Sequence, residues 1–198
     1  MIRRAALCAL ALLASACAAN RPIDQERVAP AWADRKAKLE QIHNFSVQAR
    51  AAVTGAASGS ANLTWHQGPH DFDLRVSGPL GIGALTMAGD DAEVRVHTKK
   101  QSFTTNDPEG TLHDALGWAL PIKGLRYWAL SLPSPNSEFG MTLDADGRVA
   151  TLTQDGWKVD YTDYMSVKPV DLPRRIVLTR DDLKLRVIID TWSDLAHP

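Results

Sequence analysis

Cysteine is almost absent from this chain of 198 residues, and the position of the two cysteines excludes several kinds of site. Cys8 and Cys17 both lie close to the N-terminus. The sequence after Cys17 can therefore form no internal disulfide and no thiolate metal site. A cysteine nucleophile is excluded for the same region, because catalysis of that type requires a thiol.

An excess of charge of either sign is also lacking. The chain has 22 Lys and Arg residues against 23 Asp and Glu residues, and its net charge is −1. Loss of Arg3 and Arg4 with a leader peptide would leave a domain of net charge −3. Such a domain lacks the basic surface that binds nucleic acid or attracts anionic lipid. We therefore expect no nucleic-acid partner.

Long hydrophobic runs are missing as well. The apolar stretch at 5–14 follows Arg3 and Arg4, and it is shorter than the roughly 20 residues that cross a bilayer as a helix. A basic start, a short apolar stretch and small residues after it are typical of a secretory signal peptide. We predict a signal peptide over residues 1–16.

The end of this leader resembles a bacterial lipobox, in which small residues precede a cysteine that receives lipid. The sequence is Leu13-Ala-Ser-Ala-Cys17, although Ala14 stands where the lipobox usually has leucine. We predict lipid attachment at Cys17, since lipid also caps an otherwise exposed thiol. Ordinary cleavage after Ala16, which leaves a plain cysteine, is the alternative. Ala18 follows instead of Asp, and by resemblance to bacterial sorting rules this indicates an outer-membrane anchor with the domain facing the periplasm.

The next two segments differ in composition. Residues 17–31 are largely polar and contain prolines, so we interpret them as the lipidated cysteine and a tether. Apolar residues from Trp32 to Ile42 recur at helical spacing and predict a helix over 32–43. We assign residues 32–198 to one domain.

From Phe45 onward, apolar and polar residues alternate, which is typical of an antiparallel sheet with one wet face. The alternating segments are 45–51, 61–65, 72–76, 85–87, 94–96, a short run near 103, 139–143, 149–154, 157–161, 176–178 and 183–189. Asp146-Gly147, Asp155-Gly156 and Asp181-Asp182 indicate tight turns between strands. The pattern predicts about eleven strands in a meander that curls into a barrel, which implies a cavity, a flattened sandwich or a plugged mouth.

Two short apolar segments interrupt the alternation. Leucines and a tryptophan at helical spacing predict a helix over 111–118, with Thr111 as its N-terminal cap. A second helix is predicted over 124–130. Isolated helices of this length are marginal in water. We therefore expect both to lie over the open mouth of the barrel.

The sequence contains no convincing catalytic or metal-ligating set. His66 and His70 are separated by Gly68-Pro69, which excludes a helical metal pair and favours a turn. Asp144-Ala-Asp146-Gly147 resembles the start of a calcium loop but lacks the remaining ligands, which favours a hairpin turn. No elbow motif marks a serine nucleophile. We expect no metal, no cofactor and no enzymatic activity.

Aromatic residues are the more informative group. Those on predicted strands or lid helices are Trp65, Trp118, Trp128, Phe139, Trp157 and Tyr161. One interpretation is that each simply fills the core. As a set they are also typical of a pocket that takes apolar ligands.

A hydrophobic residue stands where a hairpin tip is normally polar. In Val76-Ser-Gly-Pro-Leu-Gly-Ile-Gly-Ala-Leu85, glycines and a proline supply turn chemistry, yet Leu80 lies among them and Ile82 follows. The residue can fold back onto Ile82 or the sheet edge. It can also protrude from a rigid tip.

The order of several motifs resembles the LolB family of outer-membrane lipoproteins. The motifs are Phe45-Ser-Val-Gln-Ala-Arg50, Leu63-Thr-Trp65, Phe72-Asp-Leu-Arg-Val-Ser-Gly-Pro-Leu-Gly81, Gly117-Trp118, Leu120-Pro121-Ile122, Tyr127-Trp128, Gln154-Asp-Gly-Trp157-Lys-Val-Asp-Tyr161, Leu172-Pro173-Arg174 and Trp192, together with Cys17 after the leader. Each motif is weak by itself, and their shared order is more specific.

The resemblance implies a fold and a function. The fold is mainly β: an incompletely closed antiparallel β-barrel of about eleven strands with short α-helices as a lid over an apolar cavity. The function is that of an outer-membrane receptor, expected as a monomer. It accepts lipoproteins from a LolA-like periplasmic carrier, holds their acyl chains in a cavity, and inserts them into the outer-membrane lipid. The resemblance implies that the six aromatic residues named above line this acyl-chain cavity. Leu80, with Ile82 assisting, matches the family's membrane-insertion loop.

Three other functions stay open on the residues alone. The same cavity would suit a carrier of free lipid. A barrel filled by Trp118 and Trp128 would suit a structural outer-membrane lipoprotein. A hydrolase acting on envelope lipids is the third, and only an activity that depends on one Ser, His or Asp would support it.

Overall fold

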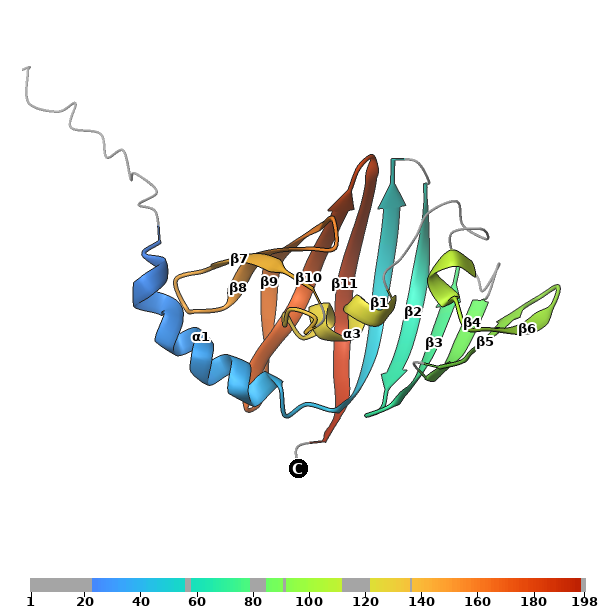
Figure 1. The fold of residues 1–198 in the computed structure, drawn as a ribbon, viewed down its shortest axis with the longest axis horizontal. Helices are drawn as coiled ribbons and strands as arrows, with labels where there is room; N and C mark the ends of the chain where they lie inside the picture. The colour runs from blue at the N-terminus through green and yellow to red at the C-terminus, as the bar shows by residue number, and fades with distance from the viewer. Residues whose placement is uncertain are drawn as a thin grey trace, which may run out of the picture.

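One antiparallel sheet dominates the molecule (Figure 1). A computed structural model describes residues 23–55, 58–78, 85–90, 92–111, 122–135 and 137–196. The strands are β1 (Asn44–Thr54), β2 (Gly59–Gln67), β3 (Asp71–Ser77), β4 (Leu85–Asp90), β5 (Val94–Thr98), β6 (Ser102–Thr105), β7 (Phe139–Leu143), β8 (Val149–Gln154), β9 (Trp157–Val167), β10 (Val170–Arg180) and β11 (Leu183–Ala196). Helices α1 (Gln25–Leu39) and α3 (Ile122–Ala129) accompany the sheet.

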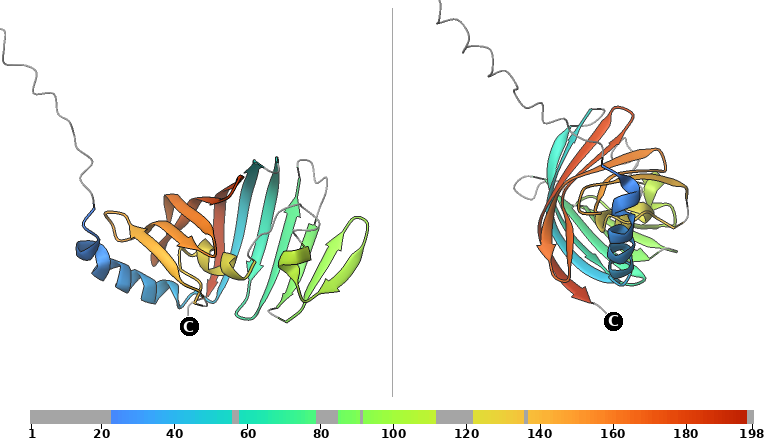
Figure 2. Two further views of the ribbon diagram at one scale, coloured as in Figure 1. Left: turned by 45° about the horizontal axis from the view of Figure 1, so that its top comes forward. Right: turned by 90° about the vertical axis from the view of Figure 1, so that its left-hand side faces the viewer.

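The sheet is a meander whose two halves meet in the middle. Its order is β6-β5-β4-β3-β2-β1-β11-β10-β9-β8-β7, so the last strand pairs with the first, while β6 and β7 are the two edges. Seen along its long axis, the sheet curls around the space that α1 and α3 occupy (Figure 2). The prediction of about eleven antiparallel strands in an incompletely closed barrel is confirmed.

Tight turns lie where Asp146-Gly147, Asp155-Gly156 and Asp181-Asp182 predicted them. Asp155 and Gly156 join β8 to β9 with φ values of 52° and 75°, the positive values that a two-residue hairpin loop of this twist requires. Gly147 has φ 72° between β7 and β8. Asp181 begins the two-residue turn between β10 and β11 with φ 48°.

Helix α1 begins seven residues earlier than the sequence predicted, at Gln25 instead of Trp32, and ends at Leu39. Asp24 caps it, because its carboxylate accepts hydrogen bonds from the backbone N–H groups of Glu26 and Arg27. The residues interpreted as tether are thus partly helical, although Pro30 lies within them. Tertiary contacts offset the proline, and the periodicity of this polar segment could not reveal them.

Those contacts include a side-chain amide bound to the edge of the sheet. The Gln25 amide nitrogen donates to the Leu143 carbonyl at 3.2 Å, and its oxygen accepts from the Leu143 N–H at 2.8 Å. At the edge strand β7, the Gln25 side chain therefore makes the two hydrogen bonds with Leu143 that a residue of a neighbouring strand would make. This shields part of an exposed strand edge.

The predicted lid helices also differ in their boundaries. Residues 108–111 are already helical, and the Asp107 carboxylate accepts from the Gly110 N–H at 2.9 Å, so Asp107 caps this turn and Thr111 does not. The rest of that predicted helix, including Trp118, lies outside the described residues. Helix α3 begins at Ile122, two residues before the predicted start.

Two hydrophobic clusters fill the inside of the curled sheet. The larger lies among α1, β1, β7–β11 and the end of α3, and Trp128, Trp157 and Leu152 are among its fully buried members. The smaller consists of Met87, Val94 and Val96, with Phe103 and Ile122 packed against it. Helix α3 reaches both clusters.

Candidate functional site

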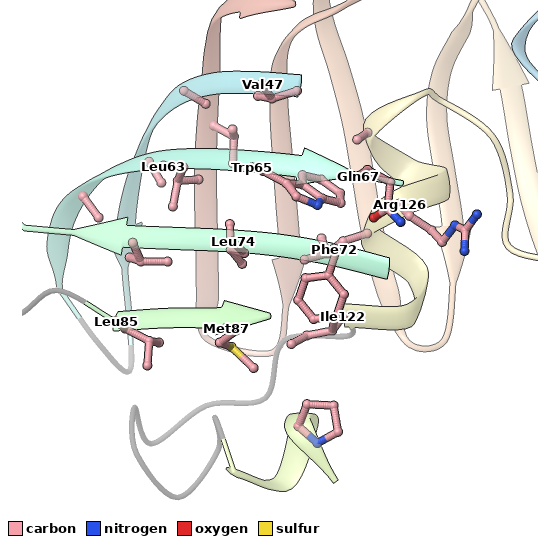
Figure 3. A pocket seen from close by; sticks show the side chains of 18 of the residues that line it. Val47, Leu63, Trp65, Gln67, Phe72, Leu74, Leu85, Met87, Ile122 and Arg126 are labelled. Atoms are coloured by element: carbon pink, nitrogen blue, oxygen red, sulfur yellow. The ribbon is translucent and has the colours of Figure 1, made fainter. Parts of the chain in front are cut away.

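An apolar cavity of about 440 Å³ lies under helix α3 (Figure 3). Inward-facing side chains of the first four strands and of β10 and β11 form its floor. Helix α3 forms the roof, through Ile122, Leu125, Arg126, Trp128 and Ala129. The volume is within the range of sites that enclose a small ligand. Most of the lining is aliphatic.

The register of the strands arranges the floor in rows. Because side chains alternate along a strand, residues two apart on β1 begin successive rows on one face. One row runs Val47, Trp65, Leu74 and Met87 across four strands, and the next runs Ala49, Leu63, Val76 and Leu85. Farther along, Ala51 lies opposite Ala61, and Val53 lies opposite Gly59.

Small residues create the space. Ala49, Ala51 and Ala61 occupy central positions of the floor, where the neighbouring rows carry leucine, tryptophan and methionine. A larger aliphatic side chain at these positions would reach the volume under α3. The cavity therefore follows from the choice of alanine on β1 and β2 as well as from the curvature of the sheet.

A buried glutamine fixes one end of the roof. Gln154, only 3% exposed, accepts hydrogen bonds from the Trp128 indole N–H and the Ser134 N–H, both at 2.8 Å. Its amide nitrogen donates to the carbonyls of Ser134 and Ser137. Both lone pairs and both N–H donors of this buried amide are thus engaged, which makes the α3 terminus rigid.

Tyrosine and glycine complete this anchor. The Tyr161 hydroxyl donates to the Trp128 carbonyl at 2.8 Å, and burial raises the pKa of Tyr161 well above its usual value. Gly124 lies one turn before Trp128, and a Cβ there would be 3.1 Å from the indole Cζ2. The absence of a side chain at Gly124 lets the indole ring lie against its own helix.

The other end of α3 rests on the smaller cluster. Ile122 packs against Met87, Val94 and Val96, while Trp128 and Ala129 belong to the larger cluster. Helix α3 therefore bridges the two halves of the sheet, and the cavity is the space it spans. An eight-residue helix gains its stability from these two contacts.

Among the described lining residues, the charged side chains lie at one end of the β2–β5 rows, where those strands turn. Gln67, His70, Asp90, Glu93 and Arg126 lie there. The backbone N–H groups of Glu93 and Ala92 bind the Asp90 carboxylate and hold its pKa below the usual value. Arg126 stacks over the Tyr127 ring, and its Nη2 donates weakly to the Pro69 carbonyl at 3.4 Å.

Comparison with known proteins agrees with this geometry. The family model described as outer membrane lipoprotein LolB matches residues 43–192, well over half of the chain. This chain belongs to the LolB family. It is 35% identical over 190 residues to the outer-membrane lipoprotein LolB of Pseudomonas aeruginosa strain LESB58, covering 93% of this chain and 92% of the relative. It is 34% identical over 197 residues to LolB of Pseudomonas syringae pv. syringae, covering 97% and 96%.

Solved structures support the fold. A LolA-superfamily protein from Nitrosomonas europaea superposes with a TM-score of 0.53 at 8% identity, covering 89% of this chain and 96% of that one. At this identity the likeness concerns the fold alone. This chain and that protein therefore share an overall fold.

The predicted cavity aromatics of this LolB-family chain separate into three groups. Trp65 and Trp128 line the cavity. Trp157 and Tyr161 are buried in the larger cluster and are not among the cavity-lining residues. The end of α3 and Gln154 pack in this part of the sheet, where the Tyr161 hydroxyl binds the Trp128 carbonyl. Phe139 is 49% exposed, since it begins edge strand β7 and has no strand beyond it.

The remaining predicted sites are outside the described residues. These are Trp118, the loop residues Leu80 and Ile82, and the lipid-attachment residue Cys17. The aliphatic rows, in turn, are cavity residues that the search for aromatics missed. Their signal was present in the alternation of Leu63, Leu74 and Met87, but a core packed solid would show the same pattern.

None of the described helices is both long and apolar enough to cross a membrane. Among the described residues, no group of three or more His, Cys, Asp or Glu side chains could hold a metal ion. His66 instead shares a 2.7 Å hydrogen bond with the Ser46 hydroxyl, and Asp144 binds two backbone N–H groups of its own turn and Arg148.

Proposed function

We propose that the cavity under α3 holds the acyl chains of a lipoprotein in transit. In this proposal the chain receives the lipoprotein from a LolA-like periplasmic carrier and inserts it into the outer membrane. As a LolB-family member it is an outer-membrane lipoprotein with a role in lipoprotein localisation. The observation that carries the finer proposal is a continuous aliphatic floor under a roof that covers it.

The dimensions of the floor suit an acyl chain. From Val47 to Val53 it extends over six residues, about 20 Å at the rise of an antiparallel strand. A bilayer core about 30 Å thick holds two chains end to end, so one chain spans about 15 Å. A single acyl chain therefore fits lengthwise along β1.

Energetics favour direct transfer between two such cavities. Each methylene exposed to water costs about 0.8 kcal/mol, so a chain of about 14 methylenes costs on the order of 11 kcal/mol. A carrier whose cavity opens against this one avoids that exposure. No nucleotide is required if each step has a higher affinity than the step before it.

Release involves the predicted loop. Burying one leucine in the boundary of the bilayer contributes about 1.5–3 kcal/mol, which is weak enough to be reversible. In the proposal, Leu80 enters the membrane and Ile82 assists, while lipid on Cys17 keeps the protein at the outer membrane.

The test uses residues 18–198, which contain every described element, and a triacylated lipoprotein bound to its periplasmic carrier. The fraction of lipoprotein that changes partner is measured first, and liposomes are then added. We expect wild-type protein to accept and release the lipoprotein, and Leu80→Glu to accept it without releasing it. Leu80→Ile, which keeps an apolar tip, is the matched control.

Other results would change the assignment. No transfer to the wild-type domain contradicts the receptor function. In that case, uptake of free phospholipid identifies a lipid-binding protein, and no uptake of any lipid identifies a structural lipoprotein. Transfer and release that Leu80→Glu leaves unchanged keep the receptor function but remove the role of the loop.

A further inference from the structure

The two ends of the cavity differ in the charge of the side chains that line them, and the register of the strands shows which residues lie at each end. The row that runs Gln67, Phe72, Gly89 and Val94 is the last one on the floor before the β2–β3 and β4–β5 turns. His70, Asp90 and Glu93 lie in or beside those turns and line the cavity. At the opposite end the lining is uncharged and consists of Val53, Ser58, Gly59 and Ser60.

Between these ends the floor carries no polar side chain on the first four strands. The two rows that begin at Val47 and Ala49 are apolar throughout. An ester or amide group placed on them would lose its hydrogen bonds to water without replacement, which is unfavourable. A ligand with one polar end therefore has a preferred direction in this cavity.

The donors at the charged end fit a carbonyl-rich group. Arg126 lies on the roof beside Gln67, with its stem on the cavity and its guanidinium directed away from the floor (Figure 3). The guanidinium has five N–H donors and makes a weak hydrogen bond to the Pro69 carbonyl. The imidazole of His70 lines the same end. Esters and amides accept hydrogen bonds, so these side chains match them.

We infer that Arg126 and His70 form a subsite for the acylated N-terminal cysteine of the lipoprotein, with the acyl chains extending toward Val53 and Gly59. The inference rests on the proposed function and adds a direction to it. The lipoprotein polypeptide then leaves the cavity beside the β2–β3 turn. The chain ends point toward the end of the sheet where Ser77 and Leu85 flank residues 78–84.

Single cysteines can measure this direction, because residues 18–198 contain no cysteine. Ser60 and Ala92 are exposed, line opposite ends of the cavity and take no part in the subsite. Ser60 lies seven residues from Gln67 on β2, so the two labels are about 24 Å or more apart along the strands. A fluorophore is attached to Ser60→Cys or to Ala92→Cys.

The probe is a synthetic triacylated cysteinyl peptide that carries a nitroxide either on the peptide or at the end of an acyl chain. We expect the peptide nitroxide to quench the label at position 92 and the chain-end nitroxide to quench the label at position 60. The reverse pattern, or equal quenching of both labels by each probe, contradicts the inference while leaving the proposed function intact. Failure of the wild-type domain to bind the probe contradicts both.

A pair of arginine variants tests the subsite itself. We expect Arg126→Met to weaken binding of the triacylated peptide about tenfold, the effect typical of a hydrogen bond from a charged group. Binding of a long-chain alkane, which has no polar end, should be unchanged. Arg75→Met on the exposed face of β3 is the matched control and should affect neither ligand. Equal weakening of both ligands by Arg126→Met would assign Arg126 to packing alone.

Discussion

Replacing Gln154 by leucine tests whether the roof of the cavity is fixed by one buried amide. The change keeps a side chain of similar length but removes its donors and acceptor. The Trp128 indole N–H and the Ser134 N–H then lose their acceptor, and the carbonyls of Ser134 and Ser137 lose a donor. Each buried donor left without a partner costs about 1–3 kcal/mol.

The expected loss of stability is therefore large. Two buried N–H groups without acceptors should lower the free energy of unfolding by about 2–6 kcal/mol. We expect about 4 kcal/mol, because part of the chain near Ser134 and Ser137 can relax toward water. A domain of this size is stable by about 5–15 kcal/mol in total. The free energy of unfolding is measured by urea titration, with tryptophan emission as the signal. Lipid uptake is measured on the same samples.

The control is a neighbouring threonine on the exposed face of the same strand. Thr153 makes one 3.3 Å bond to the Gly140 carbonyl, and Thr153→Val should cost less than about 1 kcal/mol. If Gln154→Leu lowers the free energy of unfolding no more than Thr153→Val does, the anchor does not hold α3. A loss of stability with unchanged lipid uptake under native conditions would refute the link between the anchor and the cavity.

Three further perturbations probe other parts of the structure. Burial raises the pKa of Tyr164 to about 12 and that of Tyr161 well above normal, so the unfolded chain releases these protons first as the pH rises. The stability that the two neutral tyrosines contribute is complete below pH 10 and should be lost above it. Each tyrosine should lower the free energy of unfolding by up to about 1.4 kcal/mol for each pH unit. Urea titrations at alkaline pH measure this loss, and an unchanged free energy of unfolding from pH 10 to 11.5 would contradict the prediction. Gly156→Ala places a Cβ on a residue with φ +75°, and the nearest atom is 3.8 Å from that Cβ. The change should therefore cost only the strain of a left-handed backbone, about 1–2 kcal/mol, which thermal unfolding measures. No loss of stability would show that the turn relaxes. Ala61→Phe should fill part of the cavity, lowering uptake of long-chain lipid several-fold without loss of thermal stability; uptake equal to wild type would mean that the chains do not reach this row.

Much of the fold was predictable because each strand carries its own signal. Alternation between Phe45 and Ala51 and the Asp155-Gly156 turn depend on local chemistry, and both have the expected structure. Helix boundaries were less predictable, because Pro30 argues against a helix locally. The bonds that support it there join Gln25 to Leu143, which is 118 residues away.

The candidate site was predictable only in kind. The number of strands left a cavity, a flattened sandwich or a plugged mouth open, and the family resemblance implied the apolar cavity. The residues that line it follow from the register of the strands, which the sequence does not give. Trp157 and Trp65 both alternate on strands, yet one lies under the Gln154 anchor and the other on the cavity floor. The difference depends on where α3 crosses the sheet, and the long-range bonds to Gln154 and Tyr161 decide that position.

The open space itself argues that the cavity is occupied during function. Apolar side chains that line an unfilled cavity lack the contacts they would make in a packed core, and the free-energy cost grows with the volume left open. Larger side chains at Ala49, Ala51 and Ala61 would remove much of this cost with no change of fold. Their absence is the pattern expected where stability is given up for a binding site. An acyl chain that enters the cavity restores the missing contacts, so binding and stabilisation should rise together.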